Sequence, residues 1–287
     1  MDYTLKEWIA LADKGSLADA AVRAQAAESG TDEEQVRALM LHHLRCMQEA
    51  VQDGLNPSLR SVSGLTGGQA ALLSGYVKSG RSLCGSLLGK AEAYALATAE
   101  CNACMGKIVA APTAGACGIL PGAILAMMEE RGVDERAAVD ALFVAAAVGQ
   151  SIAMTASISG AEGGCQAECG SAAAMAAAAL CFLCGGTPRQ CVDAACFAIM
   201  NLLGLVCDPV GGLVEVPCVY RNVGSSGIAF TAADLALSGI SCPIDPDEVL
   251  IAMKDVGDAL PASLRETGEG GCAACPSICK KLSRTPD

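Results

Sequence analysis

The chain has 287 residues, 52% of them apolar and only 3% aromatic, so it can bury a large core made mainly of small side chains. Small residues in this quantity predict closely packed helices, whereas a β-sandwich would need more aromatic and β-branched residues. The net charge of −12 argues against nucleic-acid binding, which requires clustered Lys and Arg side chains, so no nucleic-acid partner is expected.

Two helix-start signals stand near the N-terminus. Thr4 to Glu7 and Thr31 to Glu34 both fit the capping box, in which a hydroxyl and a carboxylate satisfy the free backbone amides of a helix start. The second signal predicts a helix over about 31–52. Apolar runs predict further helices over 68–79, 86–104, 121–131, 134–158, 168–184, 188–204 and 226–239, and Asp245-Pro246 predicts one more helix start.

The predicted fold class is mainly α, because the only short strand candidate is 212–219. Charge divides the chain into parts. The first 60 residues carry 16 charged side chains, residues 61–244 carry only 21, and the last 43 residues carry 13. We therefore predict one domain over 1–287, with a polar helical N-terminal part (1–60), an apolar helical core (61–260) and a cysteine-containing tail (261–287).

Three uncharged segments, 108–128, 141–161 and 169–188, are each about long enough to span a bilayer. They are rich in Ala and Gly, include polar residues such as Gln150 and Thr155, and lack flanking Trp or Tyr belts. We interpret them as buried core helices and expect no membrane association. No apolar signal segment is visible at the start of the sequence, which favours a cytoplasmic protein.

Four Gly-rich connections interrupt the predicted helices, at 111–122, 159–170, 207–218 and 222–227. We expect all four to be non-helical. Such loops usually form a site in an all-helical domain, because Gly lets the backbone approach a ligand closely.

Seventeen cysteines are the most unusual feature of the composition. A secreted disulfide framework is disfavoured, because such frameworks are typical of chains under about 100 residues with a signal peptide. In a reducing compartment most cysteines act as small apolar side chains, and a few bind metal. Core packing is expected for those in apolar or Ala-rich surroundings, which are Cys84, Cys117, Cys169, Cys181, Cys184, Cys191 and Cys196.

Cys165, Cys207 and Cys218 differ because each falls in a Gly- or Pro-rich loop beside carboxylates. Thiolates held by stiff loops can converge on a common point, and three of them leave one position open for a substrate. Zinc and a cubane iron–sulfur cluster both suit such a set, and these residues alone do not decide between them. The neighbouring Glu162 and Asp208 are interpreted as loop-capping residues or as residues that orient a ligand loop.

Four segments together resemble the α subunit of the iron–sulfur-dependent L-serine dehydratases: KIVAAPTAGACGILPG, SGAEGGCQAECG, MNLLGLVCDPVGGLVEVPCVYRN and RETGEGG. They follow in this order between about residues 80 and 271. The resemblance implies a helical catalytic domain whose Gly/Pro-rich loops converge on a [4Fe–4S] cluster. It implies that Cys165, Cys207 and Cys218 hold this cluster. It also implies that a tail cysteine covers the fourth iron in the resting state, with Cys279 the first choice and Cys275 the alternative.

The resemblance also implies a partner. Family members that join two domains carry a Ser-Ser-His motif in the smaller one, and this chain lacks that motif; its histidines are His42 and His43. The chain therefore resembles the two-subunit type, so we expect a separate β subunit in a hetero-oligomer or a dimer of heterodimers.

The activity that the resemblance implies is deamination of L-serine to pyruvate and ammonia, by an oxygen-sensitive lyase of amino-acid degradation and gluconeogenesis. An iron without a thiolate would act as a Lewis acid on the serine hydroxyl. Thr113, Gly115 and Ala116 are candidates for binding the substrate carboxylate. Lys107 is the catalytic candidate, as a carboxylate partner or a loop cation, or as the Schiff-base lysine of a rival pyridoxal phosphate mechanism.

Two other interpretations stay open. One is a related cluster-dependent lyase that acts on cysteine and releases sulfide. The other is a non-catalytic, thiol-rich metal-binding subunit of a larger complex.

Overall fold

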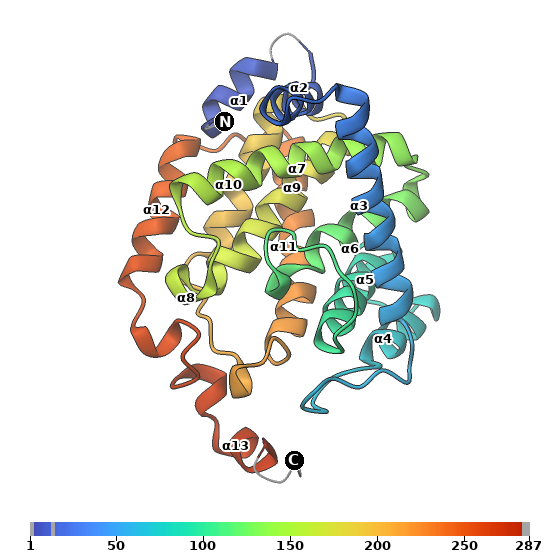
Figure 1. Ribbon diagram of the computed structural model, residues 1–287, viewed down its shortest axis with the longest axis vertical. Coiled ribbons are helices and arrows are strands. Elements are labelled where there is room, and N and C mark those ends of the chain that lie inside the picture. The colour runs from blue at the N-terminus through green and yellow to red at the C-terminus, as the bar shows by residue number, and fades with distance from the viewer. Residues whose placement is uncertain (1–2, 13–14, 283–287) are drawn as a thin grey trace.

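The structure is a computed structural model that describes residues 3–12 and 15–282. α-Helices make up most of this part of the chain, and turns and longer loops join them (Figure 1). The helices are α1 (Leu5–Ala12), α2 (Leu17–Ser29), α3 (Glu33–Gly54), α4 (Gln69–Lys78), α5 (Gly85–Ala103), α6 (Ile119–Arg131), α7 (Glu135–Thr155), α8 (Gly160–Gly163), α9 (Ser171–Leu183), α10 (Pro188–Leu202), α11 (Cys218–Leu237), α12 (Pro246–Ala259) and α13 (Pro276–Leu282). The turns between them are η1 (Ala114–Ala116), η3 (Val210–Gly212), η4 (Ala262–Leu264) and η5 (Gly271–Ala274), and a π-helical turn, η2 (Gln166–Gly170).

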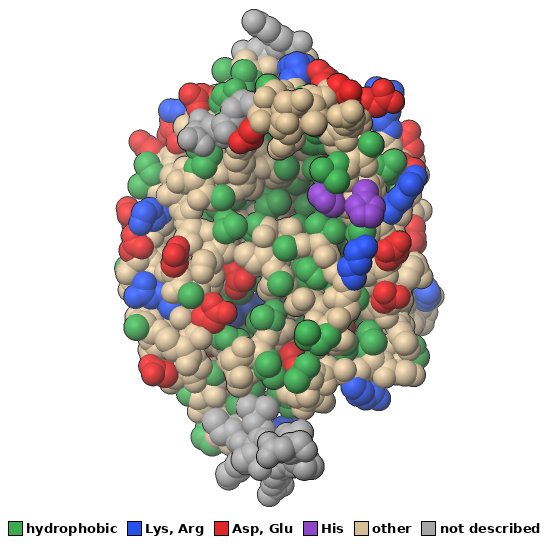
Figure 2. Space-filling model, in the orientation of Figure 1, with side chains coloured by type: hydrophobic (Ala, Val, Ile, Leu, Met, Phe, Trp, Pro, Cys, Tyr) green, Lys and Arg blue, Asp and Glu red, His purple; other side chains and the backbone are tan. Residues whose placement is uncertain are grey.

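The predicted mainly-α fold is confirmed. Throughout 3–12 and 15–282 no strand forms, and the only β contact is one isolated bridge between Cys207 and Arg265. On the face that Figure 2 shows, Lys and Arg side chains lie scattered among Asp and Glu.

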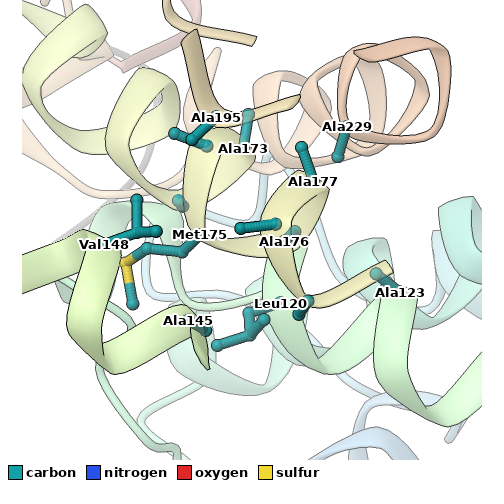
Figure 3. Close-up of a cluster of buried hydrophobic side chains, with 14 of the residues drawn as sticks. Leu120, Ala123, Ala145, Val148, Ala173, Met175, Ala176, Ala177, Ala195 and Ala229 are labelled. Atoms are coloured by element: carbon teal, nitrogen blue, oxygen red, sulfur yellow. The ribbon is translucent and has the colours of Figure 1, made fainter. Parts of the chain in front are cut away.

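The centre of the molecule is α9, which contacts α6, α7, α10 and α11. Seven of its 13 residues are Ala, and it is buried from its first residue to Cys181. Figure 3 shows its small side chains facing those of its neighbours, with Ala173 toward Ala195 of α10 and Ala177 toward Ala229 of α11. Small side chains on all sides let the surrounding helices approach closely, which explains how a core with so few aromatic residues is filled.

Two helical segments are apolar and long enough to cross a membrane by length and composition: Glu135–Thr155 and Gln166–Leu183. In their most apolar windows, 61% and 83% of the residues are buried inside the protein. Both segments therefore pack in the interior of the protein, as expected for core helices.

Most predicted helices form within a few residues of their predicted bounds, with informative exceptions. The capping box at Thr4 is confirmed, because Glu7 N donates to Thr4 Oγ1 (3.2 Å) and Thr4 N donates to Glu7 Oε2 (2.8 Å). The capping box predicted at Thr31 is wrong, because the helix cap is the next residue. Asp32 is the cap of α3 and accepts a hydrogen bond from Gln35 N at 2.8 Å.

The strand predicted at 212–219 is wrong. Gly212 has a φ of 70°, which turns the chain out of an extended path, and Pro217 lacks the N–H that a strand pairing needs. The chain instead enters α11 at Cys218. The earlier part of this loop forms the 3-10 turn η3.

The segment 222–227 was expected to be a loop, and this is also wrong, because it lies inside α11. Two side chains bond back to helix carbonyls: Asn222 Nδ2 donates to Cys218 O (2.9 Å) and Ser226 Oγ donates to Asn222 O (2.9 Å). The helix is packed against α5, α9 and α10, and this burial outweighs the poor helix propensity of Gly and Ser.

The segment 159–170 is more helical than expected, since it contains α8 and η2. Among the cysteines assigned to core packing, Cys84 and Cys184 are exposed, and the assignment is wrong for these two. It is confirmed for the buried Cys117, Cys169, Cys181, Cys191 and Cys196.

The crossing of α3 and α5 provides a test of this packing. A Cβ added at Gly54 would overlap the backbone carbonyl of Ala97 on α5, so Gly54→Ala should lower the free energy of unfolding by about 2–3 kcal/mol. Urea denaturation measures this change. The control is Gly75→Ala on α4, where an added Cβ meets nothing within 4 Å and should stabilise the helix by about 0.5–1 kcal/mol. Equal effects at the two positions would contradict the close crossing.

Candidate active site

Three loop regions meet near one end of the helical body, toward the bottom of Figure 1. They are the chain around η1, the segment of α8 and η2, and the connection from α10 to the first turn of α11. Together they carry Cys165, Cys207 and Cys218, whose side chains are all buried.

Hydrogen bonds from neighbouring loops fix the chain around Cys165 and Cys207. Gln166, next to Cys165, is 1% exposed; its backbone N donates to Leu205 O (2.9 Å) and its Nε2 donates to Met253 O (2.8 Å). Cys207 N donates to Leu264 O at 2.9 Å. Both cysteines are therefore held by backbone contacts as well as by burial.

The three thiols lie in one electrostatic neighbourhood. Burial raises the pKa of Cys218 to about 12, and the nearby Cys165 and Glu168 act in the same direction. Burial also raises the pKa of Cys207, with further contributions from Glu168, Cys165 and Cys218. Cys165 differs: its hydrogen bond with Cys169 lowers its pKa, and the positive charge of Arg221 adds to this effect. The Cys165 and Cys169 sulfurs are 3.4 Å apart.

Glu168 on η2 stands among these thiols, and the sequence analysis missed it. Thr113 Oγ1 donates to Glu168 Oε1 (2.7 Å), and Cys207 Sγ donates to Glu168 Oε2 (3.9 Å). Burial is the main cause that raises the pKa of Glu168. Its position three residues after Cys165 was the available signal, because this spacing places two side chains on one side of a helical turn.

Two glycines let the backbone close around Glu168. A Cβ added at Gly115 would lie 2.7 Å from Glu168 Oε1. A Cβ at Gly160 would lie 2.7 Å from Glu168 Oε2 and 2.8 Å from Cys207 Sγ. Larger residues at these two positions would displace the carboxylate or the thiol.

The candidates of the η1 segment do reach this region. Thr113 contacts Glu168, Gly115 lies against the Glu168 carboxylate, and Ala116 is buried. Asn222, a second residue that the sequence analysis missed, fastens this segment to α11. Its Nδ2 donates to Gly115 O (2.7 Å), and its Oδ1 accepts from the backbone N of Gly118 (2.8 Å).

Lys107 is not brought to the thiols. Its side chain is exposed, and its pKa is raised by a hydrogen bond with Cys46 of α3 and by the nearby Glu49. A lysine with a raised pKa stays protonated near neutral pH.

The two carboxylates assigned to loop capping or ligand orientation have clear partners. Glu162 Oε2 accepts a hydrogen bond from Ser157 Oγ at 2.6 Å. Asp208 is 2% exposed; its Oδ1 lies 2.7 Å from Arg221 Nη2, and its Oδ2 accepts from the backbone N of Cys272 at 2.6 Å. Asp208 therefore ties the start of the tail to the loop that carries Cys207.

Residues 266–271 of the tail lie alongside the loop that carries Cys207 and Asp208. Glu266 N donates to Cys207 O at 2.7 Å, and Gly271 packs on the Asp208 side chain. Cys275 is exposed, with its Sγ 3.8 Å from Gly271 O, and the structure does not place it among the three thiols. Cys279 belongs to α13, but its side chain lies outside the described part of the chain.

Comparison with known proteins identifies the family. The family model for the serine dehydratase alpha chain matches residues 13–273, so this chain belongs to that family. The chain is 51% identical over 238 residues to the probable L-serine dehydratase alpha chain of Bacillus subtilis, covering 83% of this chain and 79% of that one. It is 45% identical over 245 residues to the L-serine dehydratase alpha chain of Peptoniphilus asaccharolyticus, covering 85% and 84% of the two chains.

A longer relative matches over a smaller share of its length. The L-serine dehydratase TdcG of Escherichia coli is 46% identical over 183 residues, which make up 63% of this chain and 40% of that protein. Membership of the family therefore rests on the alpha chains, which match over most of their length.

The docking of the tail on Asp208 can be tested at Gly271. Its φ is +59°, and an added Cβ would overlap the Asp208 carboxyl group, so Gly271→Ala should loosen residues 265–272. We expect their amides to exchange hydrogen about tenfold faster, as measured by mass spectrometry. Gly268→Ala is the matched control, because its φ is +71° but an added Cβ meets nothing within 4 Å. Similar exchange in both variants would show that backbone strain, and not contact with Asp208, is responsible.

Proposed function

We propose that this chain is the catalytic subunit of an L-serine dehydratase, which converts L-serine to pyruvate and ammonia. The observation that carries the proposal is the similarity to two alpha chains named for this activity, at 51% and 45% identity. The burial of Cys165, Cys207 and Cys218 in neighbouring loops supports it. No observation favours the lyase acting on cysteine or the non-catalytic subunit.

We propose a [4Fe–4S] cluster held by Cys165, Cys207 and Cys218 as the cofactor. Across the described residues, no three His, Cys, Asp or Glu side chains converge closely enough to hold a single metal ion. In a cubane, three cluster thiolates each bind a different iron atom, so three cysteines leave one iron without a permanent thiolate. When bound, the cluster supplies a Lewis acid at the iron that lacks a permanent thiolate, which helps the serine hydroxyl to leave.

The residues around the thiols have complementary roles in binding the substrate. Glu168 offers the negative charge that the α-ammonium group of serine needs, and Thr113 orients this carboxylate through its hydroxyl. The η1 segment with Gly115 and Ala116 forms the adjoining wall, where the substrate carboxylate binds. Burial of these groups strengthens their interactions with a charged substrate, because water is excluded.

The pyridoxal phosphate alternative has less support. Lys107 is exposed, and the groups that act on its pKa, Cys46 and Glu49, belong to α3. That mechanism also gives no role to the three buried thiols. We propose that Lys107 takes no part in the chemical step and acts only as a positive charge outside the site.

We propose that a β subunit completes the site in a hetero-oligomer. His42 and His43 lie on α3, on the surface that Figure 2 shows, and neither belongs to the loops that carry the thiols. A histidine from the partner would supply a proton acceptor at the site. We propose that the tail covers the fourth iron in the resting state. Cys279 is the first choice for this role, and Cys275 is the alternative.

A reducing cytoplasm fits this proposal. The cysteines whose side chains the structure describes are all free thiols. Thiols remain reduced in that compartment, and a cluster with one exposed iron needs protection from oxidants.

The ligand assignment predicts the effect of removing each thiol. Cys165→Ala, Cys207→Ala and Cys218→Ala should each abolish the brown absorbance of anaerobically purified protein and reduce bound iron to background. Iron and acid-labile sulfide per chain provide the measurement. Cys196→Ala is the control, because this thiol is equally buried but lies on α10 in the apolar core. A full cluster in all three loop variants would refute the assignment.

The cofactor assignment predicts sensitivity to air. Exposure to oxygen should abolish pyruvate formation from L-serine by the complex with the β subunit, because an iron without a stable thiolate is easily lost. Anaerobic treatment with ferrous iron, sulfide and a thiol reductant should restore it. Activity that survives prolonged aeration and chelation would instead support pyridoxal phosphate.

A further inference from the structure

Glu215 lies between Cys207 and Cys218, and its carboxylate is not part of the group around Glu168. Its side chain is 2% exposed. It accepts hydrogen bonds from Ser61 Oγ (2.5 Å), from Ser63 N (3.0 Å) and from Ser63 Oγ. These donors come from a turn more than 150 residues earlier in the chain. The carboxylate therefore joins the cysteine loop to a separate part of the fold.

The turn that holds Glu215 is itself well ordered. Ser61 N donates to Thr66 O (3.1 Å), and Thr66 N donates to Ser61 Oγ (3.3 Å), which closes the turn over 61–66. A second buried carboxylate, Glu100 of α5, anchors the other side of this turn. It accepts from Thr66 Oγ1 and from Gly67 N, both at 2.7 Å.

Glu100 also caps α4, because it accepts from the backbone N of Gln69 (3.2 Å) and of Ala70 (2.9 Å). The turn thus lies between two buried carboxylates with different attachments. Glu100 connects it to α4 and α5, whereas Glu215 connects it to the cysteine loop.

The backbone of Glu215 is held as firmly as its side chain. Its carbonyl accepts from Val219 N (2.8 Å) in the first turn of α11, and Val210 N donates to Val216 O (2.8 Å) across the loop. Cys218 follows three residues after Glu215. Movement of the carboxylate would therefore shift the start of α11 and the thiol that it carries.

A buried anion needs several strong donors to offset the loss of hydration. If Glu215 served only to close a surface loop, a neutral amide would do so at less cost. We propose that Glu215 is a positioning residue, which with the turn 61–66 sets the place of the Cys218 thiol relative to Cys165 and Cys207. This inference rests on the proposed function, since it assigns Cys218 to the cluster.

The test compares two isosteric changes at the two ends of one turn. Glu215→Gln can keep an oxygen for Ser63 N, but it then places an N–H₂ where Ser61 Oγ and Ser63 Oγ now donate. Glu100→Gln places an N–H₂ against backbone amides, because both Glu100 oxygens accept from them. Both variants should lose thermal stability. Only Glu215→Gln should speed the loss of cluster to a chelator, by about tenfold, as expected when a residue that orients a metal ligand is changed.

Visible absorbance under anaerobic conditions follows the loss, with iron and acid-labile sulfide counted at the start. Equal rates of loss in wild type and Glu215→Gln would overturn the inference. An equal acceleration in both variants would also overturn it, because the effect would then come from a weakened scaffold.

A second variant keeps the test decisive if Glu215→Gln does not fold. Ser61→Ala with Ser63→Ala removes both hydroxyl donors and keeps the carboxylate, and it should speed cluster loss several-fold. An unchanged rate in this double variant would overturn the inference. Failure of the proposed function is distinguishable, since wild-type protein would then take up no cluster under the same reconstitution.

Discussion

Close packing around α9 is the constraint on which the rest of the structure depends. With Ala at seven of 13 positions, this helix contacts α6, α7, α10 and α11 at once. Such contacts tolerate little change in volume, so they fix the helices that surround α9. The loops with the three thiols leave from the ends of these helices. The positions of these loops are therefore set by the Ala-rich packing around α9 more than by the conformational preferences of the loop residues.

Buried carboxylates organise the loops that this core positions. Glu100, Glu168, Asp208 and Glu215 are all largely buried, and each joins segments that are distant in sequence. Basic residues are sparse in the middle of the chain, so hydroxyls and backbone amides supply most of the donors. An anion with several such donors holds a loop in one conformation, because losing any one of them leaves a buried charge poorly satisfied.

Sequence patterns predicted the helices well where local signals and packing agree. Apolar runs located α5, α7 and α10, and the capping box located α1. They failed for the first turns of α11, because its Gly and Ser residues are helical only through burial. The three loop cysteines could be selected from their Gly- and Pro-rich surroundings. Glu168 and Asn222 could not be selected as readily, since their importance comes from contacts with η1, more than 50 residues away in sequence.

Asp208 has one further consequence, because two groups share its charge. One oxygen pairs with Arg221, which lowers the pKa of Cys165, and the other holds the amide of Cys272. The tail and the thiol region are thus thermodynamically linked through a single anion. A ligand that binds Arg221 and breaks its ion pair with Asp208 must change how strongly Asp208 binds the backbone amide of Cys272. By thermodynamic reciprocity, breaking the bond between Cys272 and Asp208 must change the affinity of Arg221 for that ligand. The docking of residues 265–272 and the position of Arg221 are therefore coupled through this one carboxylate.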